Sequence, residues 1–138
     1  MRSLFVAVCS LILLSISSDD KKNTLLEPCP NSPNCVSTLE KRKRKRLNPL
    51  VYEGNLKTAI DKLTQILEKY PEAELIEQTS HYFHYEFTTK VGSFIDDVEF
   101  LIYPSENTVH FRSASRVGYG DFGKNRRRMK EIADEWAS

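Results

Sequence analysis

The chain has 138 residues, of which 40% are hydrophobic and 28% are charged. This length and balance fit one globular domain. The 20 Lys and Arg residues nearly cancel the 19 Asp and Glu residues, so overall charge does not support nucleic-acid binding. Any electrostatic function must therefore depend on local clusters of charge.

Residues 1–18 have the pattern of a secretory signal peptide. Arg2 supplies a positive charge, residues 4–16 form an apolar run, and Ser17 and Ser18 are small residues suited to cleavage. The apolar run is shorter than the roughly 20 residues that a membrane-spanning helix needs. We therefore expect an exported protein. The alternative is an uncleaved segment that anchors the chain in a membrane.

Cysteine usage agrees with export. Removal of the leader would leave two cysteines, Cys29 and Cys35, and an even count in an exported domain favours a disulfide. The sequence CPNSPNC contains turn-forming prolines and asparagines that could bring the thiols together. A metal pair and a reactive thiol are the alternatives. A metal site needs further ligands at recognisable spacing, so we expect a structural disulfide, no metal and no cofactor.

The segment of residues 19–54 should be extended or irregular in its first part, because prolines at 28, 30 and 33 exclude a regular helix or ladder. Residues 41–46 then read KRKRKR. We interpret this basic run, Lys41 to Arg46, as a solvated and mobile loop. The alternatives are a surface that contacts acidic lipid headgroups, at about 1 kcal/mol per basic residue, and a protease processing site.

Two amphipathic helices are predicted in residues 55–138. Apolar residues recur at three- and four-residue steps over residues 55–70 and again over residues 123–137. Pro71 should end the first helix, and Asp121 is the candidate N-cap of the second.

Strands are predicted between the two helices. Alternating apolar and aromatic residues indicate strands over residues 81–89, 96–103 and 108–115, and the short segment of residues 73–78 could form an edge strand. The turn PSEN joins the last two strands as a hairpin. The fold class is therefore α+β, with a small antiparallel sheet of three to four strands and the two helices packed mainly on one face.

Charged residues should meet within this hairpin. Asp96, Asp97 and Glu99 begin one strand, whereas Arg112 and Arg116 lie at the end of its partner. Antiparallel pairing places the start of one strand beside the end of the next. Asp97 and Glu99 should therefore lie near the arginines, on the face that the core does not use. The simplest interpretation is an ion-pair network that holds the hairpin to the following helix.

A sharper hypothesis is an anion-binding groove. Glycines let backbone amides approach a ligand, a helix start is partly positive, and guanidinium groups bind phosphate, sulfate or carboxylate. The glycine spacing matches neither the phosphate-loop nor the dinucleotide motif. The residues expected to form the groove are Arg112, Ser113, Ser115, Arg116, Gly118, Gly120, Asp121, Asn125 and Arg126.

Two other functions remain open. Asp97 and Glu99 could act as the acid and base of a hydrolase, although nearby arginines should keep both ionised. A nucleophilic serine is less favoured, because no nucleophile-elbow motif surrounds Ser113 or Ser115. The third hypothesis is a structural interaction module at a membrane surface.

Three motifs resemble the blocks of the domain-of-unknown-function family 1499. They are CPNSPNCVS from residue 29, FIDDVEF from residue 94 and RSASRVGYGDFGKNR from residue 112. The resemblance implies no particular activity, and the KRKRKR run looks like an insertion outside the shared pattern. It implies that shared residues include both cysteines, the three acidic residues, and Arg112, Ser113, Ser115, Arg116, Asp121, Asn125 and Arg126. We expect an exported binding or accessory protein for a small anion or acidic lipid headgroup.

Overall fold

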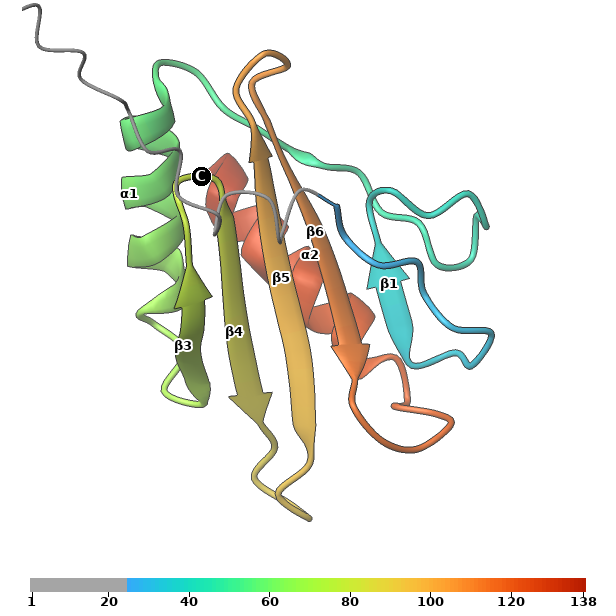
Figure 1. The fold of residues 1–138 in the computed structure, drawn as a ribbon. Coiled ribbons are helices and arrows are strands. Elements are labelled where there is room, and N and C mark those ends of the chain that lie inside the picture. The colour runs from blue at the N-terminus through green and yellow to red at the C-terminus, as the bar shows by residue number, and fades with distance from the viewer. Residues whose placement is uncertain (1–24) are drawn as a thin grey trace, which may run out of the picture.

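The computed structural model describes residues 25–138, and the predicted leader lies outside them. One antiparallel sheet carries two helices on one face (Figure 1). The α+β class is confirmed, but the sheet has six strands rather than three to four. In chain order the elements are β1 (Cys35–Ser37), β2 (Leu50–Val51), α1 (Leu56–Leu67), β3 (Ala73–Gln78), β4 (Tyr82–Thr88), β5 (Ile95–Tyr103), β6 (Thr108–Ser115) and α2 (Lys124–Ala137).

The two additional strands, β1 and β2, come from the segment that precedes the first helix. The sheet order is β1-β6-β5-β4-β3, and β2 also pairs with β6. Cys35 lies opposite Ala114, and Leu50 lies opposite Val109, so both short strands use the same edge of β6. This segment therefore completes the edge of the sheet instead of only leading into it.

The first helix begins where the sequence predicts, but it ends before residue 70, the predicted last residue. Asn55 is the N-cap, and its side chain accepts a hydrogen bond from the backbone N–H of Thr58. The regular helix ends at Leu67, and Tyr70 donates its N–H to the carbonyl of Leu67 in a tighter turn. The proline ring clashes with the preceding residue when that residue is helical, which explains why the helix stops short of Pro71.

The core lies between the sheet and the two helices. Alternate residues of β4, β5 and β6 point toward the helices, as the sequence predicted for Phe83, Tyr85 and Phe87. Both helices supply buried apolar side chains to the same cluster, including Leu63 of α1 and Met129 of α2. Burial of this aromatic and aliphatic surface is the main stabilising contribution to the fold.

The opposite face of the sheet has its own smaller apolar cluster. Leu26 packs there with Tyr82, Leu101 and Tyr103. Cys29 and Cys35 are joined in a disulfide, with their Cα atoms 5.7 Å apart, as predicted. Disulfides are typical of an oxidising, extracytoplasmic compartment. Between residues 25 and 138, neither helix has the length and apolar character needed to cross a membrane.

The basic run is more integrated than we expected. Lys45 is only 8% exposed, and its ammonium group donates to the carbonyl of Ser32. Arg42 pairs with Glu40 at 2.6 Å and donates to the carbonyl of Cys29 at 2.6 Å. The interpretation as a solvated loop is therefore wrong for Lys45, which is buried, whereas Arg42 is exposed but held by hydrogen bonds. They hold the disulfide segment because its irregular backbone leaves carbonyl groups that need donors.

Candidate functional site

The predicted convergence of β5 and β6 is confirmed. In the antiparallel register, Glu99 lies opposite Arg112 and Asp96 lies opposite Ser115. Successive side chains of a strand point to opposite faces, so these residues divide between the two faces of the sheet. The polar cluster is therefore two sites separated by the sheet, which we name the open-face ladder and the helix-face network.

The open-face ladder consists of paired charges. Arg112 lies 3.0 Å from Glu99, and Arg116 lies 2.6 Å from Asp97 and 2.5 Å from Glu86. The predicted ion-pair network is thus present. These ion pairs hold neighbouring strands together, however, and none of the three involves a residue of α2.

The carboxylate of Asp97 is held in the ionised form. Burial alone would raise the pKa of Asp97, but hydrogen bonds from Arg116 and His84 outweigh it and lower the pKa below its usual value. Tyr82 donates to Glu99 at 2.8 Å, and burial together with this carboxylate raises the pKa of Tyr82. Both predicted hydrolase carboxylates are therefore engaged by donors.

His84, Glu86 and Asp97 also place potential metal-ligand atoms within 4.8 Å of one another. The guanidinium of Arg116 already contacts both carboxylates. A cation entering this cluster would have to displace that positive charge. The chemistry of the cluster thus favours a cross-strand ion pair over metal binding.

The helix-face network centres on a buried ion pair. Asp96 is 1% exposed, and its carboxylate lies 2.6 Å from the guanidinium of Arg128 in α2. Arg128 also donates to Asn125 at 2.9 Å and to Ser113 at 3.2 Å, and it lies over the ring of Phe87. A buried ion pair needs such additional hydrogen bonds to offset the loss of solvation.

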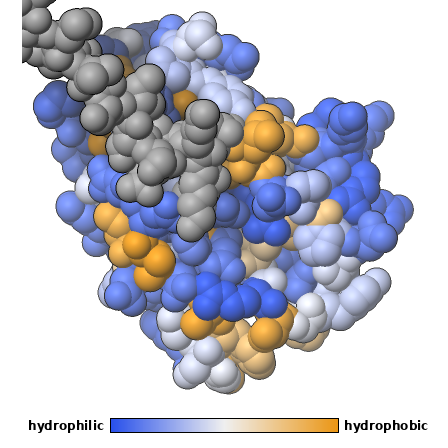
Figure 2. All heavy atoms as spheres, in the orientation of Figure 1, coloured by the Kyte–Doolittle hydropathy of each residue, from blue (hydrophilic) through white to orange (hydrophobic). Residues whose placement is uncertain are grey.

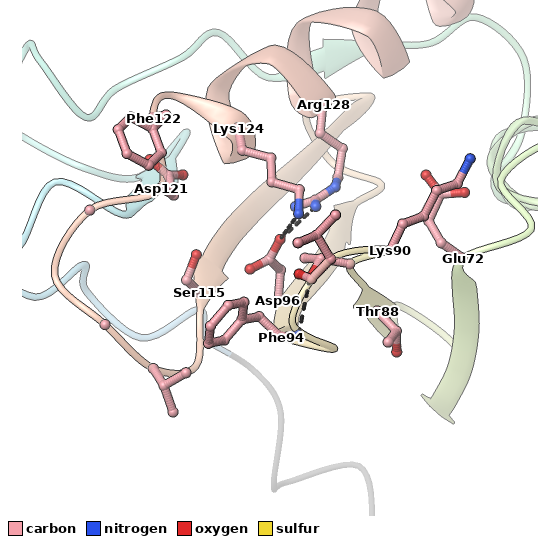
Figure 3. A pocket seen from close by; sticks show the side chains of 15 residues that line it. Glu72, Thr88, Lys90, Phe94, Asp96, Ser115, Asp121, Phe122, Lys124 and Arg128 are labelled. Carbon is pink, nitrogen blue, oxygen red and sulfur yellow. Dashed lines mark hydrogen bonds and ion pairs between the residues drawn. The ribbon is translucent and has the colours of Figure 1, made fainter.

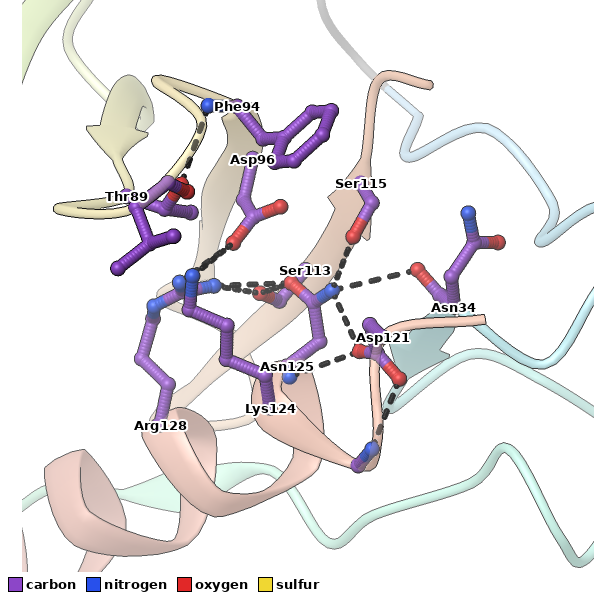
Figure 4. Close-up of polar contacts among 12 residues, drawn as sticks. Asn34, Thr89, Phe94, Asp96, Ser113, Ser115, Asp121, Lys124, Asn125 and Arg128 are labelled. Atoms are coloured by element: carbon purple, nitrogen blue, oxygen red, sulfur yellow. Dashed lines mark hydrogen bonds and ion pairs between the residues drawn. The ribbon is translucent and has the colours of Figure 1, made fainter. Parts of the chain in front are cut away.

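Asn125 joins this ion pair to the glycine bend (Figure 4). It accepts from Ser113 at 2.6 Å and donates to Ser115 at 2.9 Å and Asp121 at 2.8 Å. Its amide also reaches the carbonyl of Asn34, whose side chain donates to the carbonyl of Gly118 at 2.8 Å. One buried side chain therefore connects β6, α2, the bend and the disulfide segment.

The N-cap prediction needs correction. The N-cap of α2 is Gly123, with φ of 74°, and Asp121 lies two residues earlier. The Asp121 carboxylate nevertheless accepts from the backbone N–H groups of Gly123 and Asn125, both at 2.9 Å. Burial would raise the pKa of Asp121, but the hydrogen bonds from Asn125 and Gly123 lower it overall. Asp121 thus stabilises the helix start from outside the cap position.

An open cavity of about 540 Å³ lies directly beside the helix-face network (Figure 3). Residues 89–94, between β4 and β5, form one wall, and residues 117–122, between β6 and α2, form the other. Asp96, Lys124 and Arg128 meet at its charged floor, where Lys124 lies 3.8 Å from Asp96. The lining residues are Glu72, Thr88, Thr89, Lys90, Val91, Phe94, Asp96, Ser115, Val117, Gly118, Gly120, Asp121, Phe122, Lys124 and Arg128.

The first wall has a defined local structure. Thr89 accepts from the N–H of Phe94 at 3.0 Å and donates to the carbonyl of Val91 at 2.8 Å. Gly92 has φ of 79°, and a Cβ there would lie 2.5 Å from the Phe94 ring. Glycine therefore permits both the turn and the position of the aromatic side chain.

The predicted ligand-binding residues separate into three groups. Ser115, Gly118, Gly120 and Asp121 line the cavity, while Ser113 and Asn125 are buried in the network beside it. Arg112 and Arg116 belong to the opposite face, and Arg126 donates to the carbonyl of Arg44. The arginines therefore do not converge on one groove, because strand alternation and helix rotation direct them to different neighbours.

Sequence reasoning missed the cations that do reach the cavity, Lys124 and Arg128. A signal for Arg128 was present: Asn125, Arg128, Met129 and Ile132 form one buried stripe of α2. A basic residue on the apolar face of a helix requires a buried partner. Asp96 is that partner. It lies on the same face of β5 as Val98 and Phe100, so the alternation of the strand also indicated that Asp96 points toward the helices.

The fold and site define a small disulfide-containing α+β domain with a buried Asp–Arg pair beside a loop-walled cavity. The chain belongs to the family described as Protein of unknown function (DUF1499), whose sequence profile matches residues 25–135. This confirms the resemblance carried by the three motifs. No curated protein matches the chain.

Proposed function

We propose that this protein binds a small amphiphilic molecule with an anionic headgroup in the cavity between residues 89–94 and 117–122. The observation that carries the proposal is the combination of apolar walls and a charged floor in one open cavity. Its volume of about 540 Å³ is of the size that small-molecule sites use. The protein is then a binding or accessory protein.

The walls suit the apolar part of such a ligand. Val91, Phe94, Val117 and Phe122 line the cavity, and all four are exposed. Covering these side chains with hydrocarbon removes apolar surface from water, which favours binding by roughly 25 cal/mol per Å².

The floor suits a negative headgroup. Arg128 lies 2.6 Å from Asp96, whereas Lys124 is 3.8 Å from the same carboxylate. Asp96 thus faces two cations and compensates only one of them fully. Two other acidic residues, Glu72 and Asp121, line the cavity, and Asp121 is already engaged by two backbone N–H groups and Asn125. Lys124 shares the Asp96 carboxylate with Arg128, so its ammonium group can also bind an anion.

Ser115 adds a directional donor. Its hydroxyl oxygen accepts from Asn125 at 2.9 Å, so its own hydrogen can be donated into the cavity. A carboxylate or phosphate could accept from both Ser115 and Lys124. This differs from our sequence hypothesis, in which the anion was bound by Arg112, Arg116 and Arg126.

The proposal can be tested with three single-chain probes of equal length: decanoate, decanol and decyltrimethylammonium. Each is titrated by calorimetry below the concentration at which micelles form. We expect saturable binding, with the highest affinity for decanoate, a lower affinity for decanol and the lowest for decyltrimethylammonium. Lys124→Met should weaken decanoate binding about tenfold and leave decanol almost unchanged, since a hydrogen bond to a charged group contributes about 1.5 kcal/mol.

The matched control is Arg116→Met, which removes a cation from the opposite face. It should leave the affinity for decanoate unchanged. Absence of saturable binding by all three probes would refute the proposal. If Lys124→Met and Arg116→Met changed the affinity for decanoate equally, the cavity could still bind apolar chains, but Lys124 would not be the residue that binds the headgroup.

The hydrolase hypothesis receives no comparable support. Arg116 and His84 hold Asp97 ionised, and Glu99 accepts from Tyr82 and Arg112. A general acid needs a raised pKa, and this environment lowers that of Asp97. The open-face ladder is therefore better explained as a stabilising element of the sheet.

A further inference from the structure

We propose that the two cavity-bounding loops form a membrane-docking tip, with their apolar side chains inserted into a bilayer that contains anionic lipids. The tip is defined as residues 89–94 and 117–123. Val91 and Phe122 of the tip also line the cavity, but the inference rests on their exposure to solvent and does not depend on a ligand in the cavity.

Exposed apolar side chains are concentrated on this tip. Of the large hydrophobic side chains that are exposed within residues 25–138, half belong to these two loops. Phe122 is 98% exposed, Val91 is 86% exposed and Tyr119 is 76% exposed. Both loops project from the end of the sheet where β4 and β6 finish (Figure 1), and apolar surface gathers at that end of the space-filling view (Figure 2).

The backbone holds Phe122 outward at an energetic cost. Its φ of 53° lies in the left-handed region, which costs a non-glycine residue roughly 1–2 kcal/mol. Arg127 donates to its carbonyl at 2.7 Å, and Asp121 binds the next N–H at 2.9 Å. The loop is thus fixed by hydrogen bonds while the aromatic ring gains no burial. An external apolar partner accounts for this combination.

Charge identifies that partner as an anionic lipid surface. The first turn of α2 contains Lys124, Arg126 and Arg127 and no acidic residue, although a helix N-terminus favours acidic side chains. Lys90 adds a cation on the other loop, where residues 89–94 contain no acidic residue. The carboxylate of Asp121 is directed to backbone N–H groups. Apolar side chains beside cations match the acyl and phosphate layers of a membrane.

The same charges disfavour the other simple occupant, a second copy of the chain. Two tips meeting face to face would bring their cations together, and like charges in an interface oppose association. The bilayer has no such conflict.

Vesicle sedimentation tests the proposal with the full chain. We expect binding to phosphatidylcholine vesicles that contain phosphatidylglycerol and weaker binding to phosphatidylcholine alone. The double variant Tyr119→Ser/Phe122→Asn should lower the partition coefficient more than tenfold. Both side chains are exposed, and asparagine tolerates the positive φ, so this variant should fold.

Three comparisons make the result specific. Leu75→Thr removes an exposed apolar side chain from β3, outside the tip, and should leave binding unchanged. Lys90→Gln/Arg127→Gln should reduce the preference for phosphatidylglycerol. Neutralising Lys41, Lys43 and Arg44 tests the basic run separately. Vesicle binding that depends only on that run, or that is equal for the tip and Leu75 variants, would overturn the proposal.

Insertion itself has a direct readout. Tyr119→Trp should be quenched by bromine-labelled acyl chains when vesicles bind, whereas the native Trp136 is buried. Quenching equal to that of the unmodified chain would refute insertion. Concentration-dependent dimerisation that disappears in Tyr119→Ser/Phe122→Asn, without vesicle binding, would instead assign the tip to self-association.

Discussion

The buried ion pair between Asp96 and Arg128 should be a main determinant of stability. Arg128→Met keeps most of the side-chain volume but removes the charge from a carboxylate that is 1% exposed. Lys124, at 3.8 Å, is the remaining nearby cation and compensates only partly. Removing one partner of a buried ion pair costs about 3–5 kcal/mol. Because Lys124 remains, we expect about 3 kcal/mol, or a fall in Tm of roughly 10 °C for a domain of this size.

Urea denaturation followed by circular dichroism measures this change directly. The double variant Asp96→Leu/Arg128→Met should recover at least 1 kcal/mol relative to the sum of its single variants, because no isolated charge stays buried. Arg116→Met is the matched control: its guanidinium is also paired but partly exposed, so its loss should cost below about 1 kcal/mol. Additive single effects, or equal losses for Arg128→Met and Arg116→Met, would refute this account.

Two further predictions follow from groups outside the cavity. Burial lowers the pKa of His110, although Glu106, at 3.9 Å, partly opposes the shift. Unfolding therefore takes up a proton below the ordinary pKa of about 6.5, and stability should fall as pH decreases from 7 to 5, by at most about 1.4 kcal/mol per pH unit. His110→Gln should flatten this slope, and an unchanged slope would contradict the assignment. Non-reducing mass spectrometry should show Cys29 linked to Cys35, and replacing both with serine should cost about 2 kcal/mol; free thiols would contradict the linkage.

Local patterns were sufficient for the elements that build the core. The strand range 108–115 matches β6, because alternation over several residues reports one buried face. The range 73–78 matches β3, although the residues of this edge strand are mostly exposed. The strands β1 and β2 have only three and two residues, which is too short to show alternation. Their formation depends on the free edge of β6, a contact distant in sequence, so no local pattern could reveal them.

The candidate site shows a different limit. Alternation correctly placed Asp97 and Glu99 on the face opposite the core, and it applies equally to Asp96, which must then face the helices. Grouping all three acidic residues by their nearness in sequence concealed this division. The partner of Asp96 was identifiable only by asking which basic residue shares the buried stripe of α2, and Arg128 satisfies that condition.

This division explains how a small domain can present apolar side chains to solvent without collapse of its loops. Asn125 binds β6 through Ser113 and the bend through Asp121, and Asn34 fixes Gly118 from the disulfide segment. The hydrogen bond between Ser113 and Asn125 is buried and the other two are partly buried, so breaking them would leave polar groups without partners. The bend therefore cannot fold back to bury Phe122 without losing several of them. The polar network and the exposed aromatic ring are thus two parts of one arrangement, in which rigidity on the helix face keeps an apolar tip available outside.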